Sequence, residues 1–263
     1  MKRLSFAAVL FLAVGLCLPA AAGSWKQVGT AGGWIGTIAG AASSGLIYTV
    51  EKSGALYATD PVSGTWTQLG KSDFANTRLM FVAAGMLYSI ETDGSLYAIS
   101  PADGSWKRVG KPSDWADTIA GAVLNDRLFT VEKSGALYST HLGNGNWIQV
   151  GNKDFANTRF LFAAAGKLFS IESDGSLYAI SPKDGTWSRV GAAGSWANTI
   201  AGTAAKGLLY TVEKGGSLYE TNPASGNWKQ LGQSDFAATR FIFACQNSLF
   251  TIESSGSLYR VEI

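Results

Sequence analysis

Short runs of alternating hydrophobic and polar residues fill most of the chain, and turns that contain glycine separate them. In one stretch the runs cover Arg78–Ala83, Met86–Glu91, Ser95–Ser100 and Trp106–Val109, with Thr92-Asp93-Gly94 between the second and the third. Alternation with a period of two residues predicts β-strands, whereas a helix repeats every ~3.6 residues. Aspartate-glycine between two such runs is a hairpin signal because glycine adopts a positive φ without steric cost. The pattern therefore predicts four consecutive antiparallel strands.

This four-strand unit recurs six times at a spacing of 40 or 41 residues. The motif Trp-x-x-(Val/Leu)-Gly marks the fourth strand of each unit and begins at Trp25, Trp66, Trp106, Trp147, Trp187 and Trp228. The motif Glu-x-x-Gly-x-Leu-Tyr spans the second and third strands, with its glutamates at Glu51, Glu91, Glu132, Glu172, Glu213 and Glu253. Four-stranded units with a period near 40 residues are typical of β-propeller blades.

The repeats alternate between two types, so the larger unit is a pair of about 81 residues that occurs three times. One type contains Trp-x-x-Thr-Ile-Ala-Gly, and the other contains Asp-Phe-Ala-(Asn/Ala)-Thr-Arg. The repeats begin with a lone fourth strand at Trp25–Val28 and close with a third strand at Leu258–Val261. We expect these two strands to pair, because closure removes the exposed sheet edges of an open ring. The sequence thus predicts an all-β, six-bladed β-propeller with four antiparallel strands per blade.

The N-terminus has the layout of a secretory signal peptide. Lys2 and Arg3 precede an apolar stretch, Leu4–Leu18, and Ala20–Ala22 offers a cleavage site of the A-x-A kind. We therefore expect a signal peptide at residues 1–22 and a single propeller domain at residues 23–263, secreted to the periplasm or the extracellular space. No later segment is expected to insert into a membrane.

Charge and cysteine content narrow the possible partners. The chain has 21 Lys+Arg and 19 Asp+Glu, and loss of Lys2 and Arg3 leaves 21 − 2 = 19 against 19. A neutral protein lacks the excess of positive charge that attracts nucleic acid. Cys245 is the only cysteine left after residue 22, so the domain must rely on its hydrophobic core rather than on a disulfide.

One face of the ring is expected to carry the binding residues. The links from a fourth strand to the next blade and the turns between second and third strands emerge on this face, which we call the top face. The links contain aromatic, carboxylate and amide side chains, and the candidate ligand-binding residues are Trp34, Trp115, Trp196, Asp73, Phe74, Asn76, Asp154, Phe155, Asn157, Asp235, Phe236 and Asn198. An aromatic ring beside such polar groups suits a sugar. The alternative is that the aromatic residues plug the gaps between blades while the polar residues shape the turns.

Other repeated residues are expected to be structural. The six glutamates are interpreted as pins for backbone N–H groups, with ligand binding as the alternative. Arg78, Arg159 and Arg240 are expected to pair with nearby glutamates, and the six repeat-start tryptophans are expected to pack on the outer strands. His141 is the only histidine, and no cluster has the spacing of metal ligands or of a catalytic pair. We therefore expect no cofactor, no metal and no enzymatic activity.

The repeat resembles the tachylectin and tectonin family of β-propeller lectins. Gly32-Gly33-Trp34 matches the opening of the tachylectin pattern and Gly54-Ala55-Leu56-Tyr57 matches its close, although Trp115 and Trp196 lack the double glycine. The resemblance implies N-acetylated sugars as ligands, with sites at Trp34, Trp115 and Trp196 and at Asp73, Asp154 and Asp235. Here the repeats are shorter, the blades are more numerous and two blade types alternate.

Two functions remain open at this point. The first is a secreted multivalent lectin that binds glycans on cell surfaces, in which several weak sites on one rigid ring give avidity. The alternative is a non-catalytic protein-interaction or cell-envelope scaffold. An enzyme is disfavoured because one active site needs unlike groups from different blades, whereas this sequence repeats itself on the top face.

Overall fold

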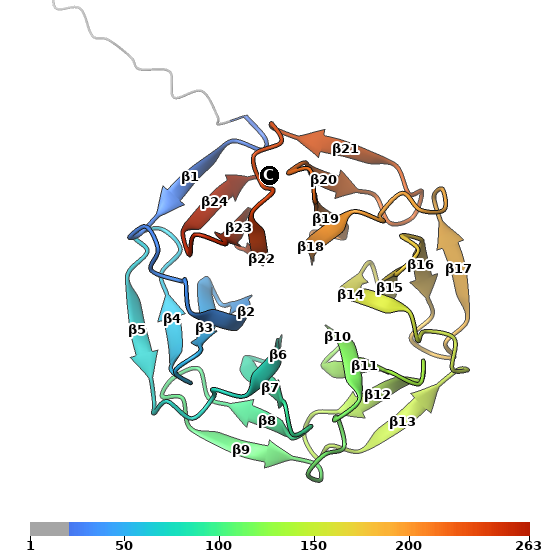
Figure 1. Cartoon of the computed structure of the whole chain (residues 1–263). Helices are drawn as coiled ribbons and strands as arrows, with labels where there is room; N and C mark the ends of the chain where they lie inside the picture. Colours follow the sequence, from blue (N-terminus) through green and yellow to red (C-terminus); the bar gives the residue numbers. More distant parts are fainter. Residues whose placement is uncertain (1–20) are drawn as a thin grey trace, which may run out of the picture.

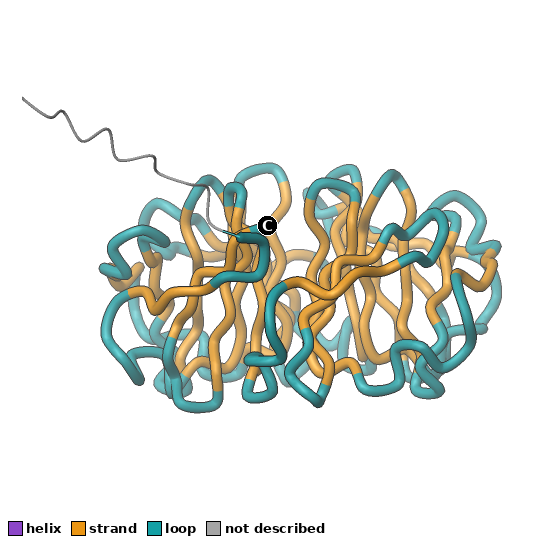
Figure 2. The backbone as a smooth tube through the Cα atoms, turned by 90° about the horizontal axis from the view of Figure 1, so that it is seen from above, coloured by secondary structure: helices purple, strands orange, loops and turns teal. Residues whose placement is uncertain are grey.

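The chain forms a closed ring of six four-stranded antiparallel sheets around a central channel (Figure 1). The computed structural model describes residues 21–263, so the predicted signal peptide lies outside the described residues apart from its last two. Within that range no helix occurs that could span a membrane. In side view the strands run between two faces of the ring, and loops gather on both (Figure 2). The predicted six-bladed propeller is confirmed.

Three blades carry the longer, tryptophan-containing link, and we call them the pocket blades. Their strands are β2 (Thr37–Ser43), β3 (Leu46–Glu51), β4 (Leu56–Thr59) and β5 (Trp66–Leu69); β10 (Thr118–Leu124), β11 (Arg127–Glu132), β12 (Leu137–His141) and β13 (Trp147–Val150); and β18 (Thr199–Ala205), β19 (Leu208–Glu213), β20 (Leu218–Thr221) and β21 (Trp228–Leu231).

The other three alternate with them, and we call them the closed blades. Their strands are β6 (Thr77–Ala83), β7 (Met86–Glu91), β8 (Leu96–Ile99) and β9 (Trp106–Val109); β14 (Thr158–Ala164), β15 (Lys167–Glu172), β16 (Leu177–Ile180) and β17 (Trp187–Val190); and β22 (Thr239–Cys245), β23 (Ser248–Glu253) and β24 (Leu258–Glu262), completed by β1 (Trp25–Val28).

The two ends of the chain share one blade, as the sequence predicts. Strand β1 pairs antiparallel with β24, with Trp25 opposite Val261 and Val28 opposite Leu258. The backbone N–H of Gly23 also donates to the carbonyl of Glu262, at 2.8 Å. The last blade is therefore complete only when both ends are in place, and the ring has no open edge at this point.

The hydrophobic core is divided into six clusters that lie between neighbouring blades. The cluster around Trp115, for example, joins Phe81 and Ile90 of one blade to Leu128 of the next. Each cluster contains one aromatic side chain from a link, namely Trp34, Phe74, Trp115, Phe155, Trp196 or Phe236. Since each blade buries its faces against two neighbours, the links complete the core rather than stand outside it.

Each link crosses the glycine turn of the preceding blade at close range. The backbone N–H of Trp115 donates to the carbonyl of Gly94, at 3.0 Å. A Cβ atom on Gly94 would lie 2.3 Å from the backbone nitrogen of Ala116, and Gly94 has φ +79°. Glycine at this turn therefore serves both the hairpin and the passage of the neighbouring link.

Candidate functional site

The link aromatics that were predicted to contact a ligand lie in the core. Trp34 and Trp115 are 2% exposed, and Trp196 is 3% exposed. The rings of Phe74, Phe155 and Phe236 are equally buried. None of these rings offers an open face on which a sugar could stack, because each is packed between two blades. Their burial agrees with the plug interpretation and moves attention to other aromatic residues on the same face.

The outer-strand tryptophans are the exposed aromatic residues of this region. Trp66, Trp147 and Trp228 of the pocket blades are 47–55% exposed. Each packs edge-on against a tyrosine of the adjacent strand, with ring centroids 4.7–4.9 Å apart. The expectation that these tryptophans only pack on the outer strand is thus half right, because one part of each indole remains open to a ligand.

In the closed blades the predicted aspartates form hydrogen bonds to the indole groups of the outer-strand tryptophans. Asp154 accepts a hydrogen bond from Nε1 of Trp187 at 3.0 Å. Asp73 accepts in the same way from Trp106 at 3.0 Å, and Asp235 accepts from Trp25 at 2.9 Å. These three carboxylates therefore hold the outer indoles in place, which is the contact that the structure assigns to them.

The pocket blades have an opening where the closed blades have this contact. Three cavities of about 120, 210 and 300 Å³ lie beside Trp66, Trp147 and Trp228, and we call them the outer pockets. The residue before the plug tryptophan is Gly33, Asp114 or Ser195. Asp114 accepts from the backbone N–H of Lys111 at 3.2 Å and not from an indole. Among residues 21–263 no hydrogen bond engages the three pocket indoles.

The walls of the outer pockets repeat from blade to blade. Each wall contains the edge of the plug tryptophan, a threonine and a glutamate of the second strand, a tyrosine of the third and the outer tryptophan. The repeated residues are Thr49, Glu51, Tyr57 and Trp66; Thr130, Glu132, Tyr138 and Trp147; and Thr211, Glu213, Tyr219 and Trp228.

Three hydroxyl groups in these walls are buried without a partner. The side chains of Thr49, Thr130 and Thr211 are 0% exposed, and their Oγ1 atoms have no hydrogen bond in the described part of the chain. A buried hydroxyl without a partner is costly, so it is the kind of group that a ligand satisfies. Of the equivalent residues in the closed blades, Ser89 donates to Glu91 at 2.7 Å, while Ser170 and Thr251 also lack a partner within residues 21–263.

The glutamate ring is structural in all six blades, although its partners differ from the predicted ones. In every blade Oε1 of the glutamate accepts from a threonine hydroxyl on the first strand, at 2.6–2.8 Å, as between Thr118 and Glu132. The prediction had named backbone N–H donors. Burial raises the pKa of all six carboxyl groups above 4.5, and the threonine hydroxyls partly offset this rise.

The predicted amide residues lie on the surface of the links. Asn76, Asn157 and Asn198 are exposed, and their backbone carbonyls accept from the residue after each second-strand glutamate. Asn198 also lines the outer pocket beside Trp228. Of the predicted site residues, then, Trp34, Trp115, Trp196 and Asn198 line outer pockets, while the remaining ones plug, brace or shape the links.

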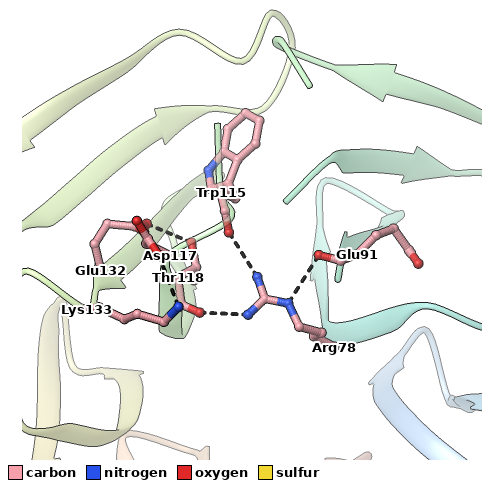
Figure 3. A network of polar contacts seen from close by, with 7 residues as sticks. All are labelled: Arg78, Glu91, Trp115, Asp117, Thr118, Glu132 and Lys133. Carbon is pink, nitrogen blue, oxygen red and sulfur yellow. Dashed lines mark hydrogen bonds and ion pairs between the residues drawn. The ribbon is translucent and has the colours of Figure 1, made fainter. Parts of the chain in front are cut away.

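The three arginines bond to carbonyls instead of pairing with glutamates as predicted. Arg78 donates to the carbonyls of Glu91, Trp115 and Thr118 at 2.9–3.2 Å, which joins two blades (Figure 3). Arg159 and Arg240 reach the next blade in the same way. Oε1 of each glutamate accepts from a threonine hydroxyl, and the guanidinium groups extend across the gap between blades. All three arginines line the central channel, which has a volume of about 530 Å³.

His141 and Cys245, which each depart from the repeat, have structural surroundings in the described part of the chain. His141 is exposed at the end of β12, and its Nδ1 accepts from the backbone N–H of Gly143 at 3.2 Å. Cys245 is buried, and burial raises the pKa of its thiol. Within the described residues no three metal-ligating side chains come together.

Sequence reasoning missed the pocket aromatics Trp66, Trp147 and Trp228 with their tyrosines. A signal for them existed. The link that leads into a pocket blade has one residue more than the link into a closed blade, and this is why the repeat spacing alternates between 41 and 40.

Comparison with known proteins supports the fold and gives one family match. Residues 20–148, just under half of the chain, match the family model of the outer membrane protein assembly factor BamB. No curated protein matches the chain.

Solved structures of other propellers resemble this one. A structural genomics protein of unknown function from Bacteroides thetaiotaomicron has a TM-score of 0.68 and 14% identity, covering 90% of this chain and 75% of that chain. The virginiamycin B lyase from Staphylococcus aureus has a TM-score of 0.60 and 12% identity, covering 91% and 88%. YCF48 bound to D1 peptide has a TM-score of 0.55 and 15% identity, covering 86% and 77%. At such low identity these likenesses show the fold alone.

Proposed function

We propose that this protein is a non-catalytic interaction scaffold of the cell envelope that holds a partner through its three outer pockets. The observation that carries the proposal is the repetition of one pocket, with the same wall residues, in every second blade. Repeated equal sites suit a binding protein, since weak contacts on a rigid ring add to a strong one. The match to the BamB family model and the signal-peptide layout of residues 1–22 support an envelope location.

A second candidate function is glycan binding at the same pockets. An exposed indole beside a tyrosine, a carboxylate and a free hydroxyl suits the C–H face and the hydroxyl groups of a sugar. The resemblance of the repeat to tachylectin and tectonin lectins points the same way. In this version the stacking residues are Trp66, Trp147 and Trp228 in place of the buried link aromatics.

The test compares two sets of tryptophans that differ only in their setting. The pocket variant changes Trp66, Trp147 and Trp228 to alanine. The matched control changes the equally exposed Trp25, Trp106 and Trp187, which are bonded to aspartate. Labelled protein is applied to a peptide array and to a glycan array. We expect peptide binding that the pocket variant loses and the control retains. Glycan binding with the same pattern would favour the second candidate, and equal binding by both variants would refute a role for the pockets.

The closed blades provide an independent test of the number of sites. Replacing Asp154 by serine removes the acceptor of the Trp187 indole. We expect this change to open a fourth pocket, so that the number of ligands bound per chain rises from three to four in titration calorimetry. Unchanged stoichiometry in a correctly folded variant would show that the aspartate does not close the site.

A further inference from the structure

The outer pockets have walls that combine aromatic rings with negative charge. The walls contain Glu51, Glu132 and Glu213, with Asp114 and Asp117 added in the second pocket, and no lysine or arginine side chain. Trp and Tyr rings attract a cation through their faces. A carboxylate beside them adds a charge-assisted hydrogen bond. This combination favours a cationic group over a neutral one.

The second oxygen of each pocket glutamate is free to take such a bond. Oε1 of Glu51 accepts from Thr37 at 2.6 Å, and no hydrogen bond to Oε2 occurs within residues 21–263. Glu132 and Glu213 have the same arrangement with Thr118 and Thr199. Among the closed blades Ser89 adds a second hydroxyl to Glu91, at 2.7 Å, whereas Glu172 and Glu253 each accept from one threonine alone in the described part of the chain. The pocket glutamates therefore share a free oxygen with two of the closed-blade glutamates, and the cavity beside them sets them apart.

The unpartnered threonines of the pocket walls add hydroxyl groups that a ligand can satisfy. Thr49, Thr130 and Thr211 are fully buried, have no partner within residues 21–263 and form part of the pocket walls. A hydroxyl oxygen can accept from an ammonium N–H that also reaches the carboxylate two residues further along the strand. Successive alternate residues of a strand lie on the same face, so Thr49 and Glu51 can bind one group together.

The pocket volumes limit the size of what enters. Sites that enclose a whole small molecule have volumes of roughly 300–1,000 Å³. Two outer pockets, of about 120 and 210 Å³, are below this range and the third, of about 300 Å³, is at its lower limit, so together they suit one group the size of a side chain. A lysine has a slim apolar stem that can pack on the half-exposed indole while its ammonium group reaches the carboxylate.

We propose that each outer pocket binds the ammonium group of a lysine side chain presented by a partner protein. The proposal rests on the proposed function and specifies the chemistry that the three pockets recognise. The outer indole and the tyrosine receive the stem. The glutamate Oε2 and the threonine Oγ1 receive the ammonium N–H groups. The partner then requires several exposed lysines on one surface to engage more than one pocket.

The charge on the glutamates gives the binding a pH dependence. Burial raises the pKa of Glu51, Glu132 and Glu213. The charges that act on them are Arg240 on Glu51, Arg159 on Glu213, and Arg78 with Asp117 on Glu132. Asp117 also pairs with Lys133 at the surface, at 3.1 Å. Lysine stays charged from neutral to acidic pH. The affinity of a pocket for lysine is therefore highest at neutral pH and falls as acidification protonates the glutamates.

The test uses the full chain and two small lysine probes, one with a charged ammonium group and one with a neutral amide in its place. Nα-acetyl-lysine amide and its Nε-acetylated counterpart are titrated at pH 7 and pH 4.5, with binding followed by calorimetry or NMR. We expect the charged probe to bind at least tenfold more tightly at pH 7 and to lose this advantage at pH 4.5. Changing Glu51, Glu132 and Glu213 to glutamine should abolish the preference, and the same change at Glu91, Glu172 and Glu253 should leave it intact.

The outcomes separate this inference from the proposed function. Equal binding of both probes, lost in the pocket variant of the three tryptophans, would overturn the lysine proposal and leave the scaffold function standing. Binding of glucosamine oligomers without binding of the lysine probe would overturn it in favour of an amino-sugar polymer. Binding of peptides and probes that ignores the pocket tryptophans would overturn both. The wild-type pH titration keeps the proposal testable even where a glutamine variant fails to fold.

Discussion

Replacing Trp115 by alanine tests whether the link aromatics are plugs of the core. The indole is 2% exposed and packs among Phe81, Ile90, Leu96 and Leu128 from two blades. Truncating a fully buried tryptophan removes its transfer free energy and leaves a cavity in packed surroundings, at a cost of about 3–5 kcal/mol. At about 2–4 °C for each kcal/mol in a domain of this size, the melting temperature should fall by roughly 6–20 °C.

Two further variants set the scale for this loss. Trp147 is 47% exposed and makes an edge-on contact with Tyr138, so its replacement by alanine should cost only about 1–2 kcal/mol. Trp115→Phe should also cost less than Trp115→Ala, since phenylalanine fills the same position in the closed blades. Unfolding by urea is followed by far-UV circular dichroism, which does not depend on the tryptophan that was removed.

The ranking of the three variants decides the question. If Trp115→Ala destabilises the protein no more than Trp147→Ala, the indole is not part of the packed core, and the plug interpretation fails. If Trp115→Ala is destabilised as expected, any loss of ligand binding in that variant is explained by its lower stability and not by a missing ligand contact. Functional tests should therefore rely on Trp147 and its equivalents.

Three other predictions follow from the same structure. Deleting residues 25–29 removes the strand that completes the last blade, so the melting temperature should fall and light scattering should detect association through the exposed edge; an unchanged monomer would contradict ring closure. The six second-strand glutamates, of which Glu51 and Glu213 are partly buried and the others buried, have raised pKa values in the folded protein. The folded state therefore binds protons more readily than the unfolded one, and their contribution should make the free energy of unfolding rise as pH falls from 7 towards 4.5. Six glutamine substitutions should remove that rise in urea titrations, and its persistence would assign it to other groups. Gly94→Ala should destabilise far more than Gly85→Ala: both have a positive φ, but a Cβ at Gly94 meets the backbone of Ala116 whereas one at Gly85 meets nothing within 4 Å. Equal melting temperatures of the two variants would contradict the close crossing of the link.

The fold could be predicted because its determinants are local and repeated. Alternation and glycine turns define the strands, the period defines the blades, and the two incomplete ends define closure. The strand ends observed in the second blade, Thr77–Ala83 and Leu96–Ile99, differ by one residue from those expected at Arg78 and at Ser95 and Ser100. Each of these features is visible without knowing how distant residues meet.

The site could not be predicted in the same way, because it depends on which of the two tryptophans in each pocket-blade repeat is buried. Trp115 and Trp147 both stand near glycines in short polar segments. Their exposure differs because the link that carries Trp115 crosses the turn at Gly94 and carries the indole into the gap between blades. Trp147 lies on β13, the outermost strand of its blade, which has no neighbouring strand on its outer edge. Only the packing of one blade against the next separates the two cases.

Link length accompanies the difference in whether the carboxylate before the plug aromatic bonds to the outer tryptophan. Asp114 precedes its plug aromatic just as Asp73, Asp154 and Asp235 precede theirs, yet it bonds to the backbone of Lys111 and leaves the indole of Trp147 free. The link into that blade has one extra residue, as in the other two pocket blades. Each longer link therefore has one added residue and carries tryptophan instead of phenylalanine as its plug aromatic. In the longer link that contains Asp114, the carboxylate bonds to the link itself and not to the outer strand. The three-fold symmetry of the pockets thus follows from the alternation of 41 and 40 residues in the repeat itself.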